Sequence, residues 1–423
     1  MSKIQNVHAR EVLDSRGNPT VEVELTTEDG IFTAMVPSGA STGTYEACEL
    51  RDEDTKRYNG KGVLKAVENV NTKISKIVMG MDSTQQKEID EAMINADGTE
   101  NKTNFGANAI LAVSIATCRA GAAAKKMELY EYVGALGENK NFILPIPMVL
   151  VLEGGKHADQ SSDLQEFMIM PHKAPNFKEA IRIGSEIYHA IGKVLKKDGF
   201  NINVGFEGAY GPSLKSNERV FQVIVEGIKL AGYKPGEEVE IAIDGAASEF
   251  YKDGKYNLQA DGKVLDAQEM VQFYEDLCSK YPIASIEDGL AEDDWETWTL
   301  LTEKLGNKIQ IIGDDLTVTN VIRLQKAIDL KAMNSILIKV NQIGTVTETI
   351  NAINLAKKNG MKAVVSHRSA ETEDTFIADF VVGMGTGYSK FGATARSERT
   401  AKYNQLMRIE EKLGGNAKYG NIL

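Results

Sequence analysis

Six ionisable residues end short apolar runs in the second half of the chain, and their types predict metal and acid–base chemistry. They are Asp244, Glu287, Asp314, Lys339, His367 and Lys390. The three acids form an oxygen-only donor set with no cysteine nearby, which suits a hard ion such as Mg²⁺ and leaves room for water or substrate. Without an ion, three clustered carboxylates would repel one another strongly. The pattern therefore predicts a divalent-cation site.

Lys339 lies in the stretch SILIKVNQIG, where apolar residues surround one ammonium group. A buried lysine near a divalent cation and a second lysine has a lowered pKa and can act as a base. The alternative is a lysine whose stem packs against apolar neighbours while its ammonium group reaches water. This stretch alone leaves both interpretations open.

A repeated strand–helix pattern is expected to bring the six residues together. The runs VEIAID, PIASIED, IQIIGDD, SILIKV, KAVVSH and DFVVGMGTGYSK are predicted strands, and amphipathic helical stretches separate them. About eight parallel strands joined in this way close into a barrel, and their C-terminal ends converge on one face. The alternative is that each residue is a solvated charge at a strand end.

The first third of the chain mixes strands and helices. TVEVELTTEDGIFTAMVP predicts a hairpin that turns at Asp29–Gly30, and helices are predicted in KGVLKAVENVNTKISKIV and NAILAVSIATCRAGAAAKKM. A composition shift at GALGENKNFILPIP places a boundary there. We predict an α/β protein with a smaller α+β domain at residues 1–137 and a modified (β/α)8 TIM-like barrel at residues 138–423.

Composition excludes several classes of protein. The formal charge is −12, from 48 basic and 60 acidic residues without a basic block, which argues against nucleic-acid binding. The start lacks the apolar core of a signal peptide, and the longest apolar run, Phe142 to Leu152, is short and carries Pro145 and Pro147, so no membrane span is expected. Cys48, Cys118 and Cys278 lie far apart, as reduced packing residues of a cytoplasmic protein do.

Glycine-flanked polar clusters precede the repeats and predict loops over a site. GGKHADQSSDLQEF contains His157 and Glu166, and NVGFEGAYGP contains Glu207. The small residues of PSGASTGTYE fit a mobile lid, with a plain surface loop as the alternative. In SHRS, His367, Arg368 and Ser369 offer a cationic fork and a hydroxyl for a phosphate or carboxylate.

From end to end, the chain resembles the enolase family. The resemblance rests on motifs that include DSRGNPTVEVEL, VPSGASTG, FGANAIL, DLQEFMIMP, SIEDGLAEDDW, GDDLTVTN, ILIKVNQIGT, SHRSAETEDT and RSERTAKYNQLMRIEE. It implies a cytoplasmic, glycolytic hydro-lyase that is a homodimer or a higher homo-oligomer. The implied reaction converts 2-phosphoglycerate to phosphoenolpyruvate and water, with two Mg²⁺ per active site.

The resemblance also implies roles for individual residues. Asp244, Glu287 and Asp314 would bind one Mg²⁺, and Ser41 in the lid would reach the other. Lys339 would remove the proton at carbon 2, while Glu207, supported by Glu166, would protonate the departing hydroxyl. The substrate's anionic groups would be held by His157, His367, Arg368, Ser369 and Lys390. A lysine base with Mg²⁺ is a known pattern of enolase-type sites.

Six positions beside these motifs depart from the family pattern. Asparagine is usual at Leu150 and Glu153, aspartate at Phe206, glycine at Ala209 and Ala370, and threonine at Phe391. Phe206 is expected to make its side of the site less polar and to raise the pKa of Glu207 by desolvation.

Three hypotheses follow from the resemblance and its departures. The first is enolase itself. The second is a paralogue that dehydrates a related phosphorylated or phosphonylated glycerate, such as carboxyphosphonoenolpyruvate synthase. The third is a non-catalytic binding protein on an enolase scaffold, against which the intact metal and proton-transfer positions argue.

Overall fold

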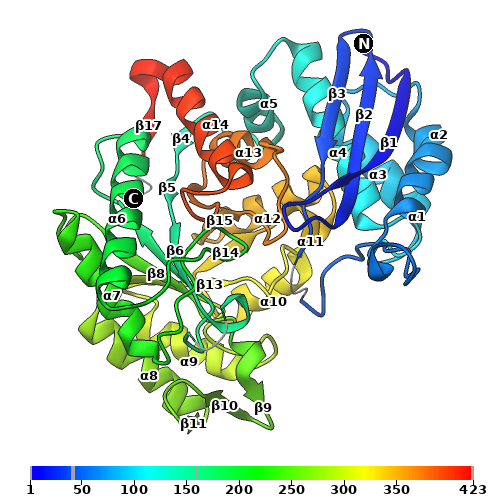
Figure 1. The fold of residues 1–423 in the computed structure, drawn as a ribbon. Coiled ribbons are helices and arrows are strands. Elements are labelled where there is room, and N and C mark those ends of the chain that lie inside the picture. Colours follow the sequence, from blue (N-terminus) through cyan, green and yellow to red (C-terminus); the bar gives the residue numbers. More distant parts are fainter. Residues whose placement is uncertain (1, 40–42, 159–160, 421–423) are drawn as a thin grey trace.

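The structure, a computed structural model, describes residues 2–39, 43–158 and 161–420. It is an α/β protein in which an N-terminal α+β part packs on a nearly closed barrel of mixed strands (Figure 1). The division predicted between residues 137 and 138 follows helix α5, which ends at Leu136, and it stays a prediction.

The N-terminal part is a three-stranded antiparallel sheet covered by helices. Its strands are β1 (Asn6–Leu13), β2 (Pro19–Thr27) and β3 (Gly30–Met35), and its helices are α1 (Leu64–Asn69), α2 (Ser75–Val78), α3 (Gln86–Asp97), α4 (Ala107–Lys125) and α5 (Leu129–Leu136). The predicted hairpin is β2–β3, in which Thr27 pairs with Gly30. Strand β1 was not predicted, although it pairs with β2 along its whole length. Both long helical predictions are confirmed, but a π-helical turn at Val70–Ile74 separates α1 from α2.

Helix α4 forms the core between this sheet and its helices. It is long and apolar enough to cross a membrane by length and composition, but 83% of that stretch is buried inside the protein. The helix contacts β2 and β3 on one side and α3 and α5 on others. Its apolar character is therefore that of a core helix.

The barrel supplies the second, larger core. Its strands are β5 (Ile146–Pro147), β6 (Val149–Glu153), β7 (Glu166–Met170), β8 (Glu240–Asp244), β12 (Ile283–Glu287), β13 (Gln310–Gly313), β14 (Ser335–Ile338), β15 (Lys362–Ser366) and β16 (Gly387–Lys390). Strands β8, β12, β13, β14, β15 and β16 pair in parallel in chain order, and β16 also pairs in parallel with β5. The Leu150 N–H, at the start of β6, donates to the Gly392 carbonyl at 3.1 Å, so the segment of β5 and β6 brings the sheet's two ends together.

The helices that surround the barrel follow its strands in sequence. They are α6 (Phe177–Lys197), α7 (Asn217–Leu230), α8 (Ala267–Lys280), α9 (Trp295–Leu305), α10 (Val321–Leu330), α12 (Val346–Lys358), α13 (Phe376–Met384) and α14 (Ser397–Leu413), with a short α11 (Val340–Ile343) directly after Lys339. Side chains of Asp266, Asp294, Asn320 and Thr345 accept N–H bonds at the starts of α8, α9, α10 and α12. These caps satisfy N–H groups that the helices leave unpaired, so each helix begins at a defined point.

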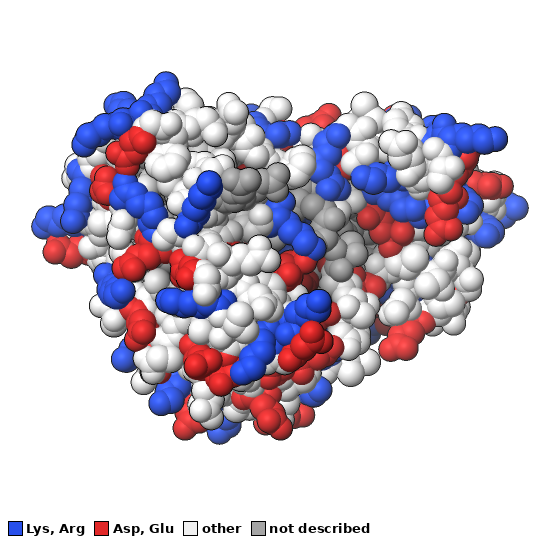
Figure 2. All heavy atoms as spheres, turned by 60° about the horizontal axis from the view of Figure 1, so that its bottom comes forward, with Lys and Arg blue, Asp and Glu red and all other residues white. Residues whose placement is uncertain are grey.

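The smaller elements lie outside this pattern. A hairpin sheet of β9 (Tyr251–Lys252), β10 (Lys255–Leu258) and β11 (Lys263–Leu265) follows β8, and β4 (Ile143–Leu144) pairs with β17 (Lys418–Tyr419). On the face drawn in Figure 2, Lys and Arg side chains are interspersed with Asp and Glu over the described residues.

One prediction about the barrel strands is wrong. The run DFVVGMGTGYSK is not one strand, because its apolar part, DFVVGM, is the end of helix α13 and only Gly387–Lys390 is extended. A short apolar run fits a buried helix as well as a buried strand, which explains this error. The predicted modified barrel is confirmed, and β7 departs from a fully parallel barrel because it is antiparallel to both β6 and β8.

Candidate active site

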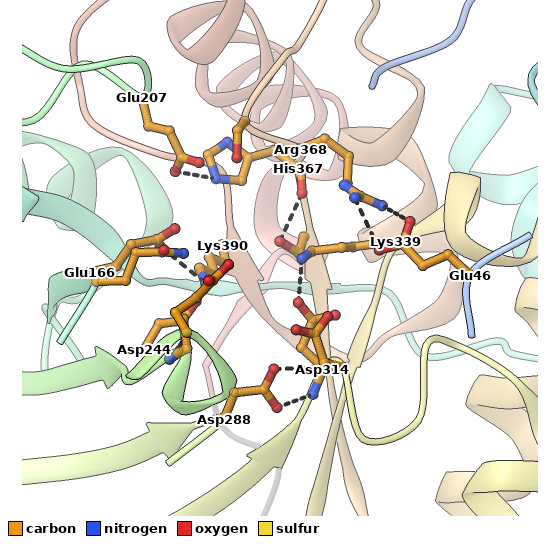
Figure 3. A pocket seen from close by; sticks show the side chains of 16 residues that line it. Glu46, Glu166, Glu207, Asp244, Asp288, Asp314, Lys339, His367, Arg368 and Lys390 are labelled. Carbon is orange, nitrogen blue, oxygen red and sulfur yellow. Dashed lines mark hydrogen bonds and ion pairs between the residues drawn. The ribbon is translucent and has the colours of Figure 1, made fainter. Parts of the chain in front are cut away.

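A buried cavity lies at the C-terminal ends of the parallel strands, where the strand-ending residues meet (Figure 3). Its lining includes Glu166, Glu207, Asp244, Asp314, Lys339, His367, Arg368, Ser369 and Lys390. Glu287 is the last residue of β12, the strand next to β8, and it is completely buried behind the cavity. Ser41 lies outside the described residues. The convergence that the strand pattern predicted is therefore present.

Lys390, at the end of β16, is surrounded by carboxylates. Its Nζ lies 2.9 Å from Asp244 Oδ2, 2.8 Å from Glu287 Oε1 and 3.0 Å from Glu166 Oε2. Burial alone would lower the pKa of Lys390, but these three acids raise it well above its ordinary value. Lys390 is therefore an ammonium group held at the centre of the acidic cluster.

Lys339, immediately after β14, forms an ion pair with Asp314. Burial favours the neutral amine, but the negative charge of Asp314 dominates and raises the pKa of Lys339. The predicted lowering of this pKa is therefore wrong for the arrangement in which Lys339 and Asp314 are partners. The alternative interpretation, an ammonium group that reaches water, also fails, because Lys339 lines the cavity and faces a carboxylate.

Asp314 is held by residues that the sequence did not single out. Its Oδ1 accepts a hydrogen bond of 2.8 Å from Gln342 Nε2. The carboxylate of Asp288, just after β12, accepts the backbone N–H groups of Asp314 and Asp315, each at 2.9 Å. Asp288 itself has a φ of 41°, in the left-handed region that a non-glycine residue rarely adopts. The residues just after β13 are thus held in place by a carboxylate at the end of the neighbouring strand, β12.

Glu207 faces His367 across the other side of the cavity. His367 Nε2 lies 3.0 Å from Glu207 Oε2, and Arg399 Nη1 lies 2.7 Å from His367 Nδ1. Because arginine only donates, Nδ1 accepts and the imidazole proton is on Nε2, directed at Glu207. Burial lowers the pKa of His367 to about 4, whereas His367 and nearby cations hold the pKa of Glu207 well below its ordinary value despite burial. The pair is a neutral histidine and a carboxylate.

Phe206 does not act on Glu207 as predicted. Its side chain is 46% exposed, so it points largely to solvent and does not desolvate the neighbouring acid. The predicted rise in the pKa of Glu207 is wrong as well, because His367 outweighs the effect of burial. The other five altered positions, Leu150, Glu153, Ala209, Ala370 and Phe391, are buried.

Glu166 lies at the cavity because β7 is antiparallel to the strands on either side of it, so β7 begins where those strands end. It is the first residue of β7 and pairs with the last residues of two flanking strands, Asp244 on β8 and Glu153 on β6. Burial and the charge of Glu207 raise the pKa of Glu166 to about 7. His157 Nδ1 lies 3.7 Å from Glu166 Oε1. At neutral pH Glu166 is therefore partly protonated.

Arg368 and Ser369 follow β15, as the SHRS stretch indicated. The Arg368 guanidinium contacts both carboxylate oxygens of Glu46, at 2.9 and 3.1 Å, and Asn341 Oδ1 at 3.1 Å. Glu46 comes from the N-terminal part, so that part completes the cavity wall. The predicted anion-binding fork is thus engaged by a carboxylate of the protein.

Two groups of described residues bring potential metal ligands within 4.8 Å of one another. One is Asp288, Asp314 and Asp315, and the other is His157, Glu166 and Glu207. The predicted set of Asp244, Glu287 and Asp314 is not one of these groups. In this structure Lys390 binds the first two acids, and Lys339 binds the third. The oxygen-only donors nevertheless suit a hard divalent ion, and the acidic cluster already accommodates positive charge at its centre.

Two family models cover nearly the whole chain. The model described as the enolase N-terminal domain matches residues 4–133, and the model described as the enolase C-terminal TIM barrel domain matches residues 141–422. Both matches agree with the α+β part and the barrel seen in the structure.

Proposed function

Because the chain belongs to the enolase family, we propose that it is a Mg²⁺-dependent hydro-lyase that converts 2-phosphoglycerate to phosphoenolpyruvate and water. Members of this family are typically hydro-lyases that use divalent metals and bind small phosphorylated substrates. The observation that carries the proposal is that Lys339 and Glu207, from distant segments, line one buried cavity with acidic residues between them. That arrangement offers a base and an acid to one small substrate.

Lys339 is the proposed base for the proton at carbon 2. This proton is very weakly acidic, because its removal beside a carboxylate gives a dianionic intermediate. A base must be a neutral amine, and Asp314 keeps Lys339 charged as long as the two are partners. Asp314 and Glu287 both raise the pKa of Lys339 and both would hold the metal ion, so with them engaged burial and the charges of Arg368 and Lys390 would lower that pKa.

Asp244, Glu287 and Asp314 are the proposed ligands of one Mg²⁺, and Ser41 of a second. Bound Mg²⁺ supplies Lewis-acid stabilisation of the negative charge that develops on the substrate carboxylate, worth several kcal/mol. Lys390 Nζ contacts two of these carboxylates, Asp244 and Glu287, which supports the proposal that they share one positive centre.

Glu207 is the proposed donor of a proton to the departing hydroxyl, supported by Glu166. Glu166, with a pKa of about 7, can hold that proton at neutral pH. Ligand atoms of the two carboxylates lie within 4.8 Å of each other, so the proton has a short path. Positioned proton transfer of this kind contributes roughly 10²–10⁴-fold to a rate.

The remaining polar residues of the site are proposed to hold the anionic groups of the substrate. They are His157, His367, Arg368, Ser369 and Lys390. With this function we propose that the protein is a homodimer, that it is cytoplasmic and that it acts in glycolysis.

A direct assay tests the proposed function. Purified protein is given 2-phosphoglycerate with Mg²⁺, and the absorbance of phosphoenolpyruvate is followed, with EDTA in the control reaction. We expect Mg²⁺-dependent turnover in the ordinary enzyme range of roughly 1–10³ per second. Absence of turnover while Mg²⁺ still binds would contradict the assignment of 2-phosphoglycerate as substrate.

A second candidate is dehydration of a phosphonylated analogue, as in carboxyphosphonoenolpyruvate synthase. It is favoured by one observation, that Leu150, Glu153, Ala209, Ala370 and Phe391 depart from the family pattern and are all buried. Turnover of a phosphonate analogue by protein that does not use 2-phosphoglycerate would support it. Failure of both substrates would leave the non-catalytic hypothesis.

A further inference from the structure

Glu153 is a buried acid that the proposed reaction does not use. It ends β6, its side chain has 0% exposure, and its carboxyl lies under the turn formed by residues 205–209. Oε1 accepts the backbone N–H groups of Glu207 at 3.2 Å and Ala209 at 3.3 Å. The backbone N–H of Glu153 donates to the Tyr210 carbonyl at 2.9 Å. These contacts all end on the segment that carries Glu207.

Gly205 provides the room for this carboxyl. A Cβ at Gly205 would lie 1.8 Å from Glu153 Oε2 and 2.5 Å from Cδ, which is an impossible approach. The backbone of Gly205 is outside the left-handed region, so its conformation alone does not require glycine. The absence of a side chain is therefore explained by the close packing of Glu153. The turn is closed by the Gly205 N–H, which donates to the Ala209 carbonyl at 2.9 Å.

We propose that Glu153 is the positioning residue of Glu207. Its carboxyl holds the 205–209 turn by accepting two of the turn's backbone N–H groups, and it thereby orients the Glu207 carboxylate toward the cavity and toward His367. The inference rests on the proposed function for its catalytic consequence. Its structural part, that Glu153 determines where Glu207 lies, stands independently. Glu153 acts through backbone amides and touches no reacting atom.

The charged surroundings of Glu153 suggest the matched control. Its carboxyl interacts electrostatically with Glu207 in the turn, Glu166 on β7 and the Tyr188 phenol on α6. Burial, Glu207 and Glu166 raise the pKa of Glu153 to about 8, so it is largely protonated at pH 7. A neutral carboxyl presents a carbonyl oxygen to the two N–H groups, as a glutamine amide of the same length would. Glu153→Gln should therefore preserve the turn, whereas Glu153→Leu keeps the bulk and removes the acceptor.

The first measurement is steady-state kinetics on these two variants. We expect Glu153→Leu to lower kcat by about 10–100-fold with a smaller change in KM, since a displacement near 1 Å costs that much in a positioned group. Glu153→Gln should stay within about threefold of the parent. Equal losses in both variants, or no loss in Glu153→Leu, would overturn the proposal.

A second measurement separates failure of this proposal from failure of the proposed function. The imidazole ¹⁵N resonances of His367, assigned by their loss in His367→Gln, report the contact with Glu207 without any substrate. They should keep their parent positions in Glu153→Gln and move in Glu153→Leu. Unmoved resonances in Glu153→Leu would contradict the positioning role even if the parent has no turnover with 2-phosphoglycerate.

A double-mutant cycle tests the packing of Glu153 against Gly205. Gly205→Ala alone should move the His367 resonances, because the new methyl displaces the Glu153 carboxyl. Glu153→Ala should do so as well, and the double variant should be no worse than either single one, since the displaced group is then already absent. Additive effects on folding temperature and on the resonances would show that the two residues act independently.

Discussion

At the scale of single residues, Lys339 is an amine whose protonation state depends on one carboxylate. Lys339→Ala should slow exchange of the carbon 2 proton of 2-phosphoglycerate with solvent by about 10²–10⁴-fold. Mg²⁺ affinity should not fall, because the substitution removes the cation that occupies Asp314. Exchange in ²H₂O followed by NMR, and calorimetric Mg²⁺ titration, measure the two effects. The exposed Lys304 gives a matched control in Lys304→Ala, and exchange at the parent rate in Lys339→Ala would refute the base assignment.

Glu153 also predicts a pH dependence of stability. Its pKa is raised from 4.5 to about 8 in the folded protein, so folding favours the protonated form. The parent is therefore at its most stable, relative to Glu153→Gln, below pH 4.5, and it loses this advantage as the pH rises to about 8. Relative to the parent, the free energy of unfolding of Glu153→Gln should rise by up to about 1.4 kcal/mol per pH unit over that interval. Thermal denaturation at pH 5, 6.5 and 8 measures this, and a constant difference would contradict it.

Residue types and spacing were enough to predict that the strand-ending residues converge. The cavity is lined by Asp244, Asp314, Lys339, His367 and Lys390 because each ends, or directly follows, a strand of the same sheet. The orientation of loop residues could not be predicted in this way. Phe206 points to solvent although it neighbours a buried acid, because contacts of the 205–209 turn with β6 decide which side chains face inward.

At the scale of elements, the link between β12 and β13 controls the position of a proposed metal ligand. The Asp288 carboxylate accepts two N–H groups at the end of β13, where an amide would offer one acceptor and oppose the second N–H with a donor. Asp288→Asn should therefore weaken Mg²⁺ binding by about 10–100-fold, as loss of outer-shell support commonly does. Calorimetric titration measures it, with the exposed Asp276→Asn on α8 as control. An affinity for Mg²⁺ equal to that of the parent in Asp288→Asn would show that the end of β13 keeps its position without the Asp288 carboxylate.

The alternation of strands and helices was predictable, but strand direction was not. An apolar run has the same composition whether its strand is parallel or antiparallel to its neighbours, so the residues of β7 do not reveal its antiparallel direction. Strand β1 was missed for a different reason. Val7 and Ala9 alternate with the polar His8 and Arg10, as in a half-buried strand, but Glu11 takes the next position of that alternation and ends the apolar pattern early.

At the scale of the whole molecule, buried acids give a prediction about stability and metal. Asp244, Glu287 and Asp314 repel one another, and their compensation comes from Lys390 and Lys339. A cation that binds the folded state alone stabilises it by about 2.7 kcal/mol at a hundredfold excess over its Kd. MgCl₂ should therefore raise the melting temperature in calorimetry, relative to EDTA and to NaCl of equal ionic strength. The Asp244→Asn variant should show a smaller rise, and an equal rise would place the ion elsewhere.

Contacts between the two parts of the molecule could not be predicted from either part. Glu46 and Arg368 are separated by 322 positions and form a two-oxygen contact at the cavity wall. Arg119 and Asp374 make a second such contact at 2.7 and 2.8 Å. Each pair joins segments whose local patterns are independent. Such partners become visible only when both parts are folded together.

The reversed course of β7 has a consequence for how the entrance of the cavity can vary. Strand β6 ends at Glu153, and β7 begins at Glu166, on the same rim of the barrel, so the connection between them starts and ends on that rim. This stretch, which includes His157, can lengthen or shorten without shifting any strand. A change in the length of this one connection can therefore alter which substrates enter the cavity, while the strands that carry the acids and lysines keep their positions.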